Sequence, residues 1–241
     1  MALKILQSLS LPGDPAKANE DAFGHGEAAA VVVDGATPLG DTQKSFEALR
    51  RHPPEEMWQT PCASMMLAVL VGNELELLWY GDCGALVKQG DGAVTVVGES
   101  FDKRAAEAGR AQALARKMNL PPAAGLSRQE FIGRLRAARN RINSGDNWLF
   151  SPDVKAAAHG SRRVMKLAPG SILLLATDGF LALASDYGAY SSDSLMAAAM
   201  SKGLAALGEE LRAIEAGDSG GDKFPRFKKS DDATALLLQL S

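Results

Sequence analysis

Residues 172–183 read ILLLATDGFLAL, and the order of residue types in this stretch decides the fold. The apolar run at its start predicts a strand buried on both faces, because a strand with one wet face would alternate apolar and polar residues. The run ends at Asp178 and Gly179. A carboxylate at the mouth of a buried strand is costly without a partner, so Asp178 either caps the following helix or binds something.

The same dipeptide ends a second apolar run. Residues 28–35 read AAAVVVDG, so that three valines lead directly into Asp34 and Gly35. Two strands that both end in Asp-Gly make helix capping an insufficient explanation. Further acids beside apolar strands are Glu20 and Asp21 in NEDAFG, Asp82 in YGDCGALV, and Asp231 and Asp232 in SDDATALLL.

These acids would repel one another if three or more of them converged. Two carboxylates about 4 Å apart repel by about 4 kcal/mol at an effective dielectric of about 20. Such a cluster stays ionised only around cations. An all-oxygen set without supporting His or Cys ligands favours Mg²⁺ or Mn²⁺ over zinc.

Bulk composition is that of an ordinary globular protein of 241 residues, 46% hydrophobic and 23% charged, with no internal repeat. We expect one domain over residues 1–241 and, without 18 consecutive apolar residues, no transmembrane helix. Two cysteines without metal-type spacing fit reduced thiols and a cytoplasmic location.

Charge is unevenly distributed along the chain. Residues 103–141 carry ten Lys or Arg against two Glu, a net charge of +8, so the rest carries −11 of the total of −3. This basic stretch is either a solvated helical face or a surface that recruits an anionic partner. The negative total argues against a general nucleic-acid binder.

The order of elements favours an α+β fold over strict βαβ alternation. Strands are predicted over 4–11, 28–35, 161–170, 171–179 and 231–240, with two hairpins within 63–98 that turn at Gly72-Asn73 and Gly90-Asp91-Gly92. Helices are predicted over 41–51, 102–120, 127–142 and 194–216. Two antiparallel sheets facing each other, with helices outside, would bury the continuous apolar strands.

Five short motifs together resemble the protein phosphatase 2C family of metal-dependent serine/threonine phosphatases. They are NED at 19–21, VVVDGAT at 31–37, YGDCGALV at 80–87, LLLATDGF at 173–180 and SDDAT at 230–234, in the order and rough spacing of that family. The resemblance covers the chain from about Leu3 to Leu240. It implies a four-layer αββα sandwich, two antiparallel sheets flanked by helices, with a basic helical flap segment at about residues 101–150.

The resemblance also implies a metal site at one end of the sandwich. Asp34 would bridge two Mn²⁺ or Mg²⁺ ions, and the carbonyl of Gly35 would bind one of them. Asp178 and Asp231 would complete one shell, Glu20 and Asp21 would hold waters of the second ion, and Asp82 would bind a weaker third ion with Asp178. Asp34, Asp178 and Asp231 would then carry the hydrolysis of phosphoserine and phosphothreonine in proteins by a metal-activated water.

The sequence departs from the family pattern at two functional positions and, more modestly, at a third. The usual phosphate-binding Arg is replaced by Ala16, so that the adjacent Lys17 would have to supply the positive charge, without the guanidinium fork. The His that often follows the second motif is Ala36, and Asp232 stands where the family usually has Asn.

Two other functions remain open from the sequence. One is a non-catalytic pseudophosphatase, a metal-containing regulatory or binding module, which the missing Arg favours and the retained acids oppose. The other is a two-metal phosphodiesterase or nuclease, which the net acidity and the few aromatic residues disfavour. For the leading interpretation we expect a monomer that acts on phosphorylated protein, with neither nucleic acid nor a membrane as partner.

Overall fold

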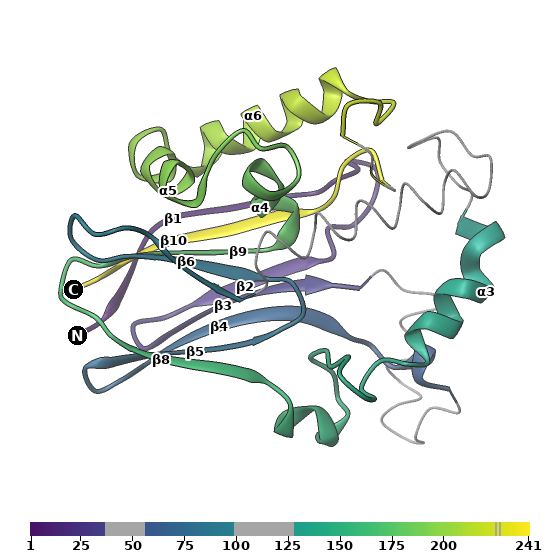
Figure 1. Cartoon of the computed structure of the whole chain (residues 1–241), viewed down its shortest axis with the longest axis horizontal. Helices are drawn as coiled ribbons and strands as arrows, with labels where there is room; N and C mark the ends of the chain where they lie inside the picture. Colours follow the sequence, from purple (N-terminus) through teal and green to yellow (C-terminus); the bar gives the residue numbers. More distant parts are fainter. Residues whose placement is uncertain (37–55, 99–127, 225, 227) are drawn as a thin grey trace.

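The computed structural model describes residues 1–36, 56–98, 128–224, 226 and 228–241. It consists of two five-stranded antiparallel sheets that face each other, with helices outside them (Figure 1). The predicted α+β sandwich of two antiparallel sheets flanked by helices is confirmed. The helices predicted over 41–51 and 102–120 lie outside the described residues.

The first sheet joins strands from both ends of the chain. Its order is β1-β10-β9-β6-β7. The bounds are β1 Leu3–Leu11, β10 Ala233–Leu240, β9 Ile172–Ala176, β6 Gly84–Lys88 and β7 Thr95–Gly98. β1 pairs with β10 over nearly its whole length, from Leu3 opposite Leu240 to Leu11 opposite Ala233. The N-terminal strand therefore needs the last described strand as its partner.

The second sheet has the order β2-β3-β4-β5-β8. Its strands are β2 Asp21–His25, β3 Ala29–Gly35, β4 Ala63–Val71, β5 Glu74–Tyr80 and β8 Ser161–Lys166. Sequence reasoning did not predict β2, since this edge strand of five residues contains Gly24 and is mostly exposed, without the alternation that identifies a half-buried strand. The two predicted hairpin turns, β4–β5 and β6–β7, are confirmed.

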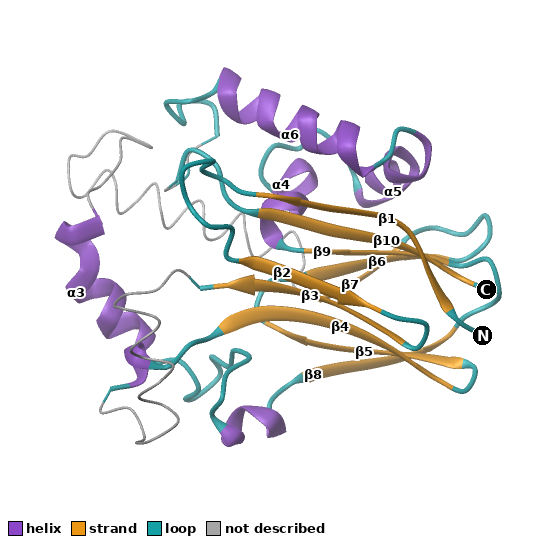
Figure 2. Ribbon diagram, turned by 180° about the vertical axis from the view of Figure 1, so that it is seen from behind, coloured by secondary structure: helices purple, strands orange, loops and turns teal. Residues whose placement is uncertain are grey.

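Three helices cover the outer face of the first sheet: α4 Asp178–Ser185, α5 Ser192–Ser201 and α6 Leu204–Gly217 (Figure 2). The helix predicted over 194–216 is thus two helices. α3, Arg128–Arg139, lies beyond the strand ends on the side away from the termini (Figures 1 and 2). Two 3₁₀ helices, η1 Met57–Gln59 and η2 Val154–Ala158, complete the described elements. Among the described residues no helix is long and apolar enough to cross a membrane.

β9 shows why its sequence is continuously apolar. Leu173 and Leu175 point into the core between the two sheets, whereas Ile172 and Leu174 pack against the helices of the outer layer. Successive side chains of a strand point to opposite faces, so a strand between two apolar layers has no polar position. This strand therefore delivers Thr177 and Asp178 to the edge of two hydrophobic cores at once.

The acidic motifs gather at the end of the sandwich opposite the termini. β3 ends there, β2 and β10 begin there, and β9 leads there into α4. At the same end the chain crosses from β5 in the second sheet to β6 in the first, through Gly81 and Asp82. Five separate chain segments are thus brought to one edge.

Candidate metal centre

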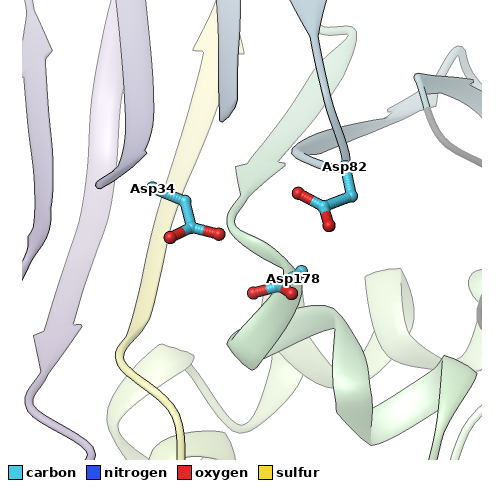
Figure 3. Close-up of side chains that lie close together, drawn as sticks. All are labelled: Asp34, Asp82 and Asp178. Carbon is cyan, nitrogen blue, oxygen red and sulfur yellow. The ribbon is translucent and has the colours of Figure 1, made fainter. Parts of the chain in front are cut away.

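Three carboxylates from distant parts of the chain converge at this end. Asp34 lies near the end of β3, Asp82 lies in the crossing between the sheets, and Asp178 is the first residue of α4. One oxygen of each carboxylate lies within 4.8 Å of the others. Figure 3 shows the three side chains directed toward a common space. At such separations each pair repels by about 4 kcal/mol at an effective dielectric of about 20, so the cluster favours a cation or protons.

Asp178 is not the cap of the helix that follows it. The N-cap residue of α4 is Thr177, and Asp178 lies in the first turn. A first-turn carboxylate interacts favourably with the helix dipole, typically by 0.3–1 kcal/mol. This is about an order of magnitude less than the summed repulsion from two neighbouring carboxylates, so helix stabilisation alone does not account for the placement of Asp178.

Asp21 extends the acidic cluster along the second sheet. It is the first residue of β2 and lies directly opposite Asp34 in the β2–β3 register. The hydroxyl of Thr177 donates a hydrogen bond of 2.8 Å to Asp21 Oδ2. Asp21 Oδ1 is buried and has no hydrogen-bond partner among the described residues. A buried acceptor of this kind is compatible with a role as a cation ligand.

Asp232 fastens the loop that leads to β2. Its Oδ1 accepts a hydrogen bond of 2.7 Å from the backbone N–H of Gly13, and its Oδ2 accepts one of 2.6 Å from the N–H of Glu20. These two bonds use the two separate oxygens of the carboxylate. An Asn side chain has only one acceptor oxygen, so in this geometry it could accept only one of them. Asp in place of the family's usual Asn therefore serves this loop, which positions Glu20 and Asp21.

Asp231 lies beside the cluster and is paired with a lysine. Lys228 Nζ lies 2.7 Å from Asp231 Oδ1. The backbone carbonyl of Asp231 accepts a hydrogen bond of 2.9 Å from Arg212, whose guanidinium also bonds the carbonyls of Leu11 and Pro12. Arg212 thus joins α6, the end of β1 and the entrance to β10. The three-carboxylate group does not include Asp231, although its charge contributes to the electrostatics of Asp34.

Burial and mutual repulsion raise the pKa of two of these acids. Burial is the largest cause for Asp34, followed by the charges of Asp178 and Asp82, and together they raise its pKa to about 10. For Asp21, burial raises the pKa to about 6 against the opposing hydrogen bond from Thr177. Without a cation, the folded protein therefore holds a proton on Asp34 at neutral pH that an unfolded Asp would release.

This proton uptake predicts the pH dependence of the metal-free protein. Both carboxyl groups have folded pKa values above the ordinary 3.8, so the folded state binds more protons than the unfolded state. The free energy of unfolding should therefore fall as pH rises from about 4, by up to about 1.4 kcal/mol per pH unit for each group. The contribution of Asp21 should end near pH 6, and that of Asp34 should continue toward pH 10.

Urea unfolding in the presence of a chelator, at pH 5, 7 and 9, measures this slope. The variant Asp34→Asn should flatten it above pH 6. A metal-free protein whose stability is constant or rises over this range would contradict the arrangement of the buried acids.

Two glycines allow the acidic segments to approach this closely. A Cβ atom on Gly35 would overlap the backbone carbonyl oxygen of Glu20, and one on Gly179 would overlap that of Asp232. The glycines of the two Asp-Gly dipeptides therefore let the backbones of neighbouring acidic motifs touch. Gly35 also donates a backbone hydrogen bond of 3.1 Å to the same Glu20 oxygen.

Sequence reasoning missed the hydroxyl groups that orient the acids. Ser64 lies opposite Asp34 in the β3–β4 register, and its hydroxyl donates a hydrogen bond of 2.6 Å to Asp82 Oδ1. Thr177 orients Asp21 and also accepts a bond of 3.0 Å from the backbone N–H of Thr234. Thr177 could have been noticed as the neighbour of Asp178, but no sequence signal links Ser64 to Asp82.

Lys17, the predicted phosphate-binding residue, lies on the loop before β2. Its ammonium is paired with Asp14 at 3.0 Å, and 78% of its side chain is exposed. Its role in phosphate binding stays a prediction.

Comparison with known proteins relates this architecture to solved phosphatases. No protein-family model matches the sequence, and no curated protein matches it either. The structure is similar to the Mycobacterium tuberculosis serine/threonine phosphatase PstP/Ppp, with a TM-score of 0.52 and 15% identity over 100% of both chains. It is also similar to the photosystem II phosphatase PBCP, with a TM-score of 0.54 and 16% identity over 99% of both chains.

A third similar structure is the catalytic domain of PstP in complex with two manganese ions, with a TM-score of 0.50 and 15% identity over 100% of this chain and 99% of that one. The two facing sheets with their outer helices thus have the architecture of a known class of phosphatase domains. The chain has the protein phosphatase 2C fold, and the sequence resemblance to that family is confirmed at the level of fold.

Proposed function

We propose that this chain is a metal-dependent protein serine/threonine phosphatase, a phosphoric monoester hydrolase that uses a metal-activated water. One observation carries the proposal: Asp34, Asp82 and Asp178 converge at one end of a protein phosphatase 2C sandwich. Each of them comes from a motif that resembles that family. The fold alone would not favour catalysis over binding, whereas the convergence of carboxylates supports a cation site and therefore catalysis.

The residues present fit Mn²⁺ or Mg²⁺. All the candidate ligands are oxygen atoms, which hard divalent cations prefer. Burial and repulsion hold Asp34 protonated unless a cation is near, and the buried oxygen of Asp21 has no hydrogen-bond partner among the described residues. We propose two ions and a weaker third, held by Glu20, Asp21, Asp34, Gly35, Asp82, Asp178 and Asp231.

When bound, such ions would acidify a water and neutralise charge on the phosphoryl oxygens. The chain's own residues prepare this site. Ser64 and Thr177 fix the orientation of Asp82 and Asp21 through hydroxyl hydrogen bonds. Asp232 fixes the loop that carries Glu20. Fixed ligands cost no reorganisation when the substrate reacts.

A pseudophosphatase is the alternative, and the ion pair between Lys228 and Asp231 gives it a specific argument. Asp231 is a proposed metal ligand, yet it is already paired with the ammonium of Lys228, which could take the place of a metal ion there. The absence of Arg at position 16 and of His at position 36 points the same way. The convergence of the other carboxylates favours the enzyme.

Metal removal separates the two functions. Hydrolysis of p-nitrophenyl phosphate and of a phosphothreonine peptide should require added Mn²⁺ or Mg²⁺ and should fall to background after chelation, because the carboxylates alone supply no electrophile. Asp34→Asn should abolish the activity. Asp91→Asn, in the β6–β7 turn, removes the same charge away from the site and should leave it unchanged.

Full activity after exhaustive chelation would rule out the mechanism. Binding of Mn²⁺ without hydrolysis of either substrate would identify the pseudophosphatase. We further propose phosphorylated protein as the substrate class, a monomeric assembly and a cytoplasmic location. The two free, buried thiols, Cys62 and Cys83, are compatible with a reducing compartment.

A further inference from the structure

Lys228 lies at the edge of the acidic site, within reach of the Asp231 carboxylate and of solvent. It belongs to the loop between α6 and β10, and its Nζ lies 2.7 Å from Asp231 Oδ1. The side chain is 57% exposed and that of Asp231 is 43% exposed. The ammonium therefore sits between solvent and the acidic edge, where a substrate would approach.

Asp231 links this ammonium to the central acids. Asp231 contacts Lys228 directly, and its charge also acts on Asp34. Lys228 is thus one contact away from the converging carboxylates, and its hydrogen bond is to Asp231 alone among them.

The backbone around Lys228 is anchored while its side chain can move. Arg226 donates to the carbonyl of Lys229 at 2.9 Å and forms an ion pair of 2.7 Å with Asp218. A fixed base with a flexible four-carbon stem lets an ammonium exchange between nearby anions without loop movement.

We propose that Lys228 is an exchangeable cation of the site: it neutralises Asp231 in the metal-free protein, and a metal ion at Asp231 displaces it onto the phosphoryl oxygens of the substrate. The inference rests on the proposed function. An oxygen atom that ligates a divalent cation is a weaker acceptor for an ammonium, whereas a phosphoryl group brings new charge and several acceptors. Lys228 thereby supplies the positive charge that the chain lacks at position 16.

The first half of the proposal is tested by metal affinity. Titration calorimetry with Mn²⁺ alone should show Lys228→Met binding about two- to fivefold more tightly than wild type, since the metal no longer displaces a partly exposed ion pair. Lys229→Met removes the same charge one residue away and should bind Mn²⁺ as wild type does. Equal affinities of the wild type and Lys228→Met would overturn the proposal.

The second half is tested by anion affinity of the Mn²⁺-loaded protein. Lys228→Met should weaken binding of inorganic phosphate, and raise the KM for a phosphothreonine peptide, by about tenfold, the size of one charge-assisted hydrogen bond. Lys228→Arg should retain most of the affinity. Lys17→Ala should change it less than Lys228→Met does, and the opposite order would assign the phosphate to Lys17.

Failure of this inference differs from failure of the proposed function. A wild type that binds Mn²⁺ and hydrolyses the peptide, with Lys228→Met indistinguishable from Lys229→Met in both assays, refutes the exchange and leaves the phosphatase intact. A wild type that binds no Mn²⁺ refutes the metal site itself.

Discussion

Replacing Asp178 with Asn is expected to lower the kcat of phosphomonoester hydrolysis by about a hundred- to a thousandfold, the size of a lost electrostatic contact in a reaction's transition state. Asp178 is one of the three converging carboxylates, and its removal would take away a proposed ligand and the largest single charge that repels Asp34. Steady-state hydrolysis of p-nitrophenyl phosphate with saturating Mn²⁺ measures the loss.

The same variant should be no less stable than wild type when metal is absent. Removing one charge relieves repulsion on Asp34, whose pKa burial and its acidic neighbours hold high. Mn²⁺ should raise the Tm of wild type clearly, by an amount that corresponds to about 2.7 kcal/mol at a concentration a hundred times Kd. The variant should gain much less.

A matched control separates the metal from the helix dipole. Asp193 is the first-turn acid of α5, and its carboxylate accepts a hydrogen bond of 2.8 Å from the backbone N–H of Val94. Asp193→Asn should cost stability with or without Mn²⁺ and leave hydrolysis unchanged. If Asp178→Asn behaves as Asp193→Asn does, then Asp178 serves only its helix.

The second large effect concerns the backbone and not a charge. Gly179→Ala should destabilise the protein by about 3 kcal/mol or more, because the added methyl group would overlap the carbonyl oxygen of Asp232 at a place where neither backbone can retreat freely. Asp232 is held by its bonds to Gly13 and Glu20, so a shift would also disturb the loop before β2. Urea unfolding at fixed pH and Mn²⁺ concentration measures the change.

Gly133→Ala provides the reference for this substitution. Gly133 lies inside α3, and outside the helix's own backbone no atom of the described residues lies within 4 Å of the position that its Cβ would take. The change should be stabilising by up to about 1 kcal/mol, as for an exposed helical Gly. Equal and small effects of the two substitutions would mean that the contact between Gly179 and Asp232 is not tight.

Much of the fold follows from sequence periodicity. β9 and β10 are identified by continuous apolar runs, and the hairpins β4–β5 and β6–β7 by glycines at their turns. The pairing of strands far apart in the sequence cannot be predicted from periodicity. The register of β1 with β10, for example, depends on the closed sandwich and not on any local signal. β2 was not predicted for a different reason, because its few residues carry no hydrophobic pattern.

The candidate site divides along similar lines. Asp34 and Asp178 could be identified because each interrupts a buried apolar run, and the structure brings both of them close to Asp82. The hydroxyl groups that orient the acids could not be identified from the sequence, because Ser64 reaches Asp82 only through the register of β3, β4 and β5. Lys228 is a further case: among so many lysines and arginines, only its position against Asp231 distinguishes it.

The clamp of Asp232 on the loop before β2 also bears on the order in which the chain is made. Glu20 and Asp21 leave the ribosome before the carboxylate that holds their loop and before the strand that pairs with β1, both of which come more than 200 residues later. During synthesis β1 therefore has no strand partner, and the positions of Glu20 and Asp21 are not fixed. Such long-range closure is slow, and it means that the loop carrying Glu20 and Asp21 is not held beside the other acids until β10 has docked.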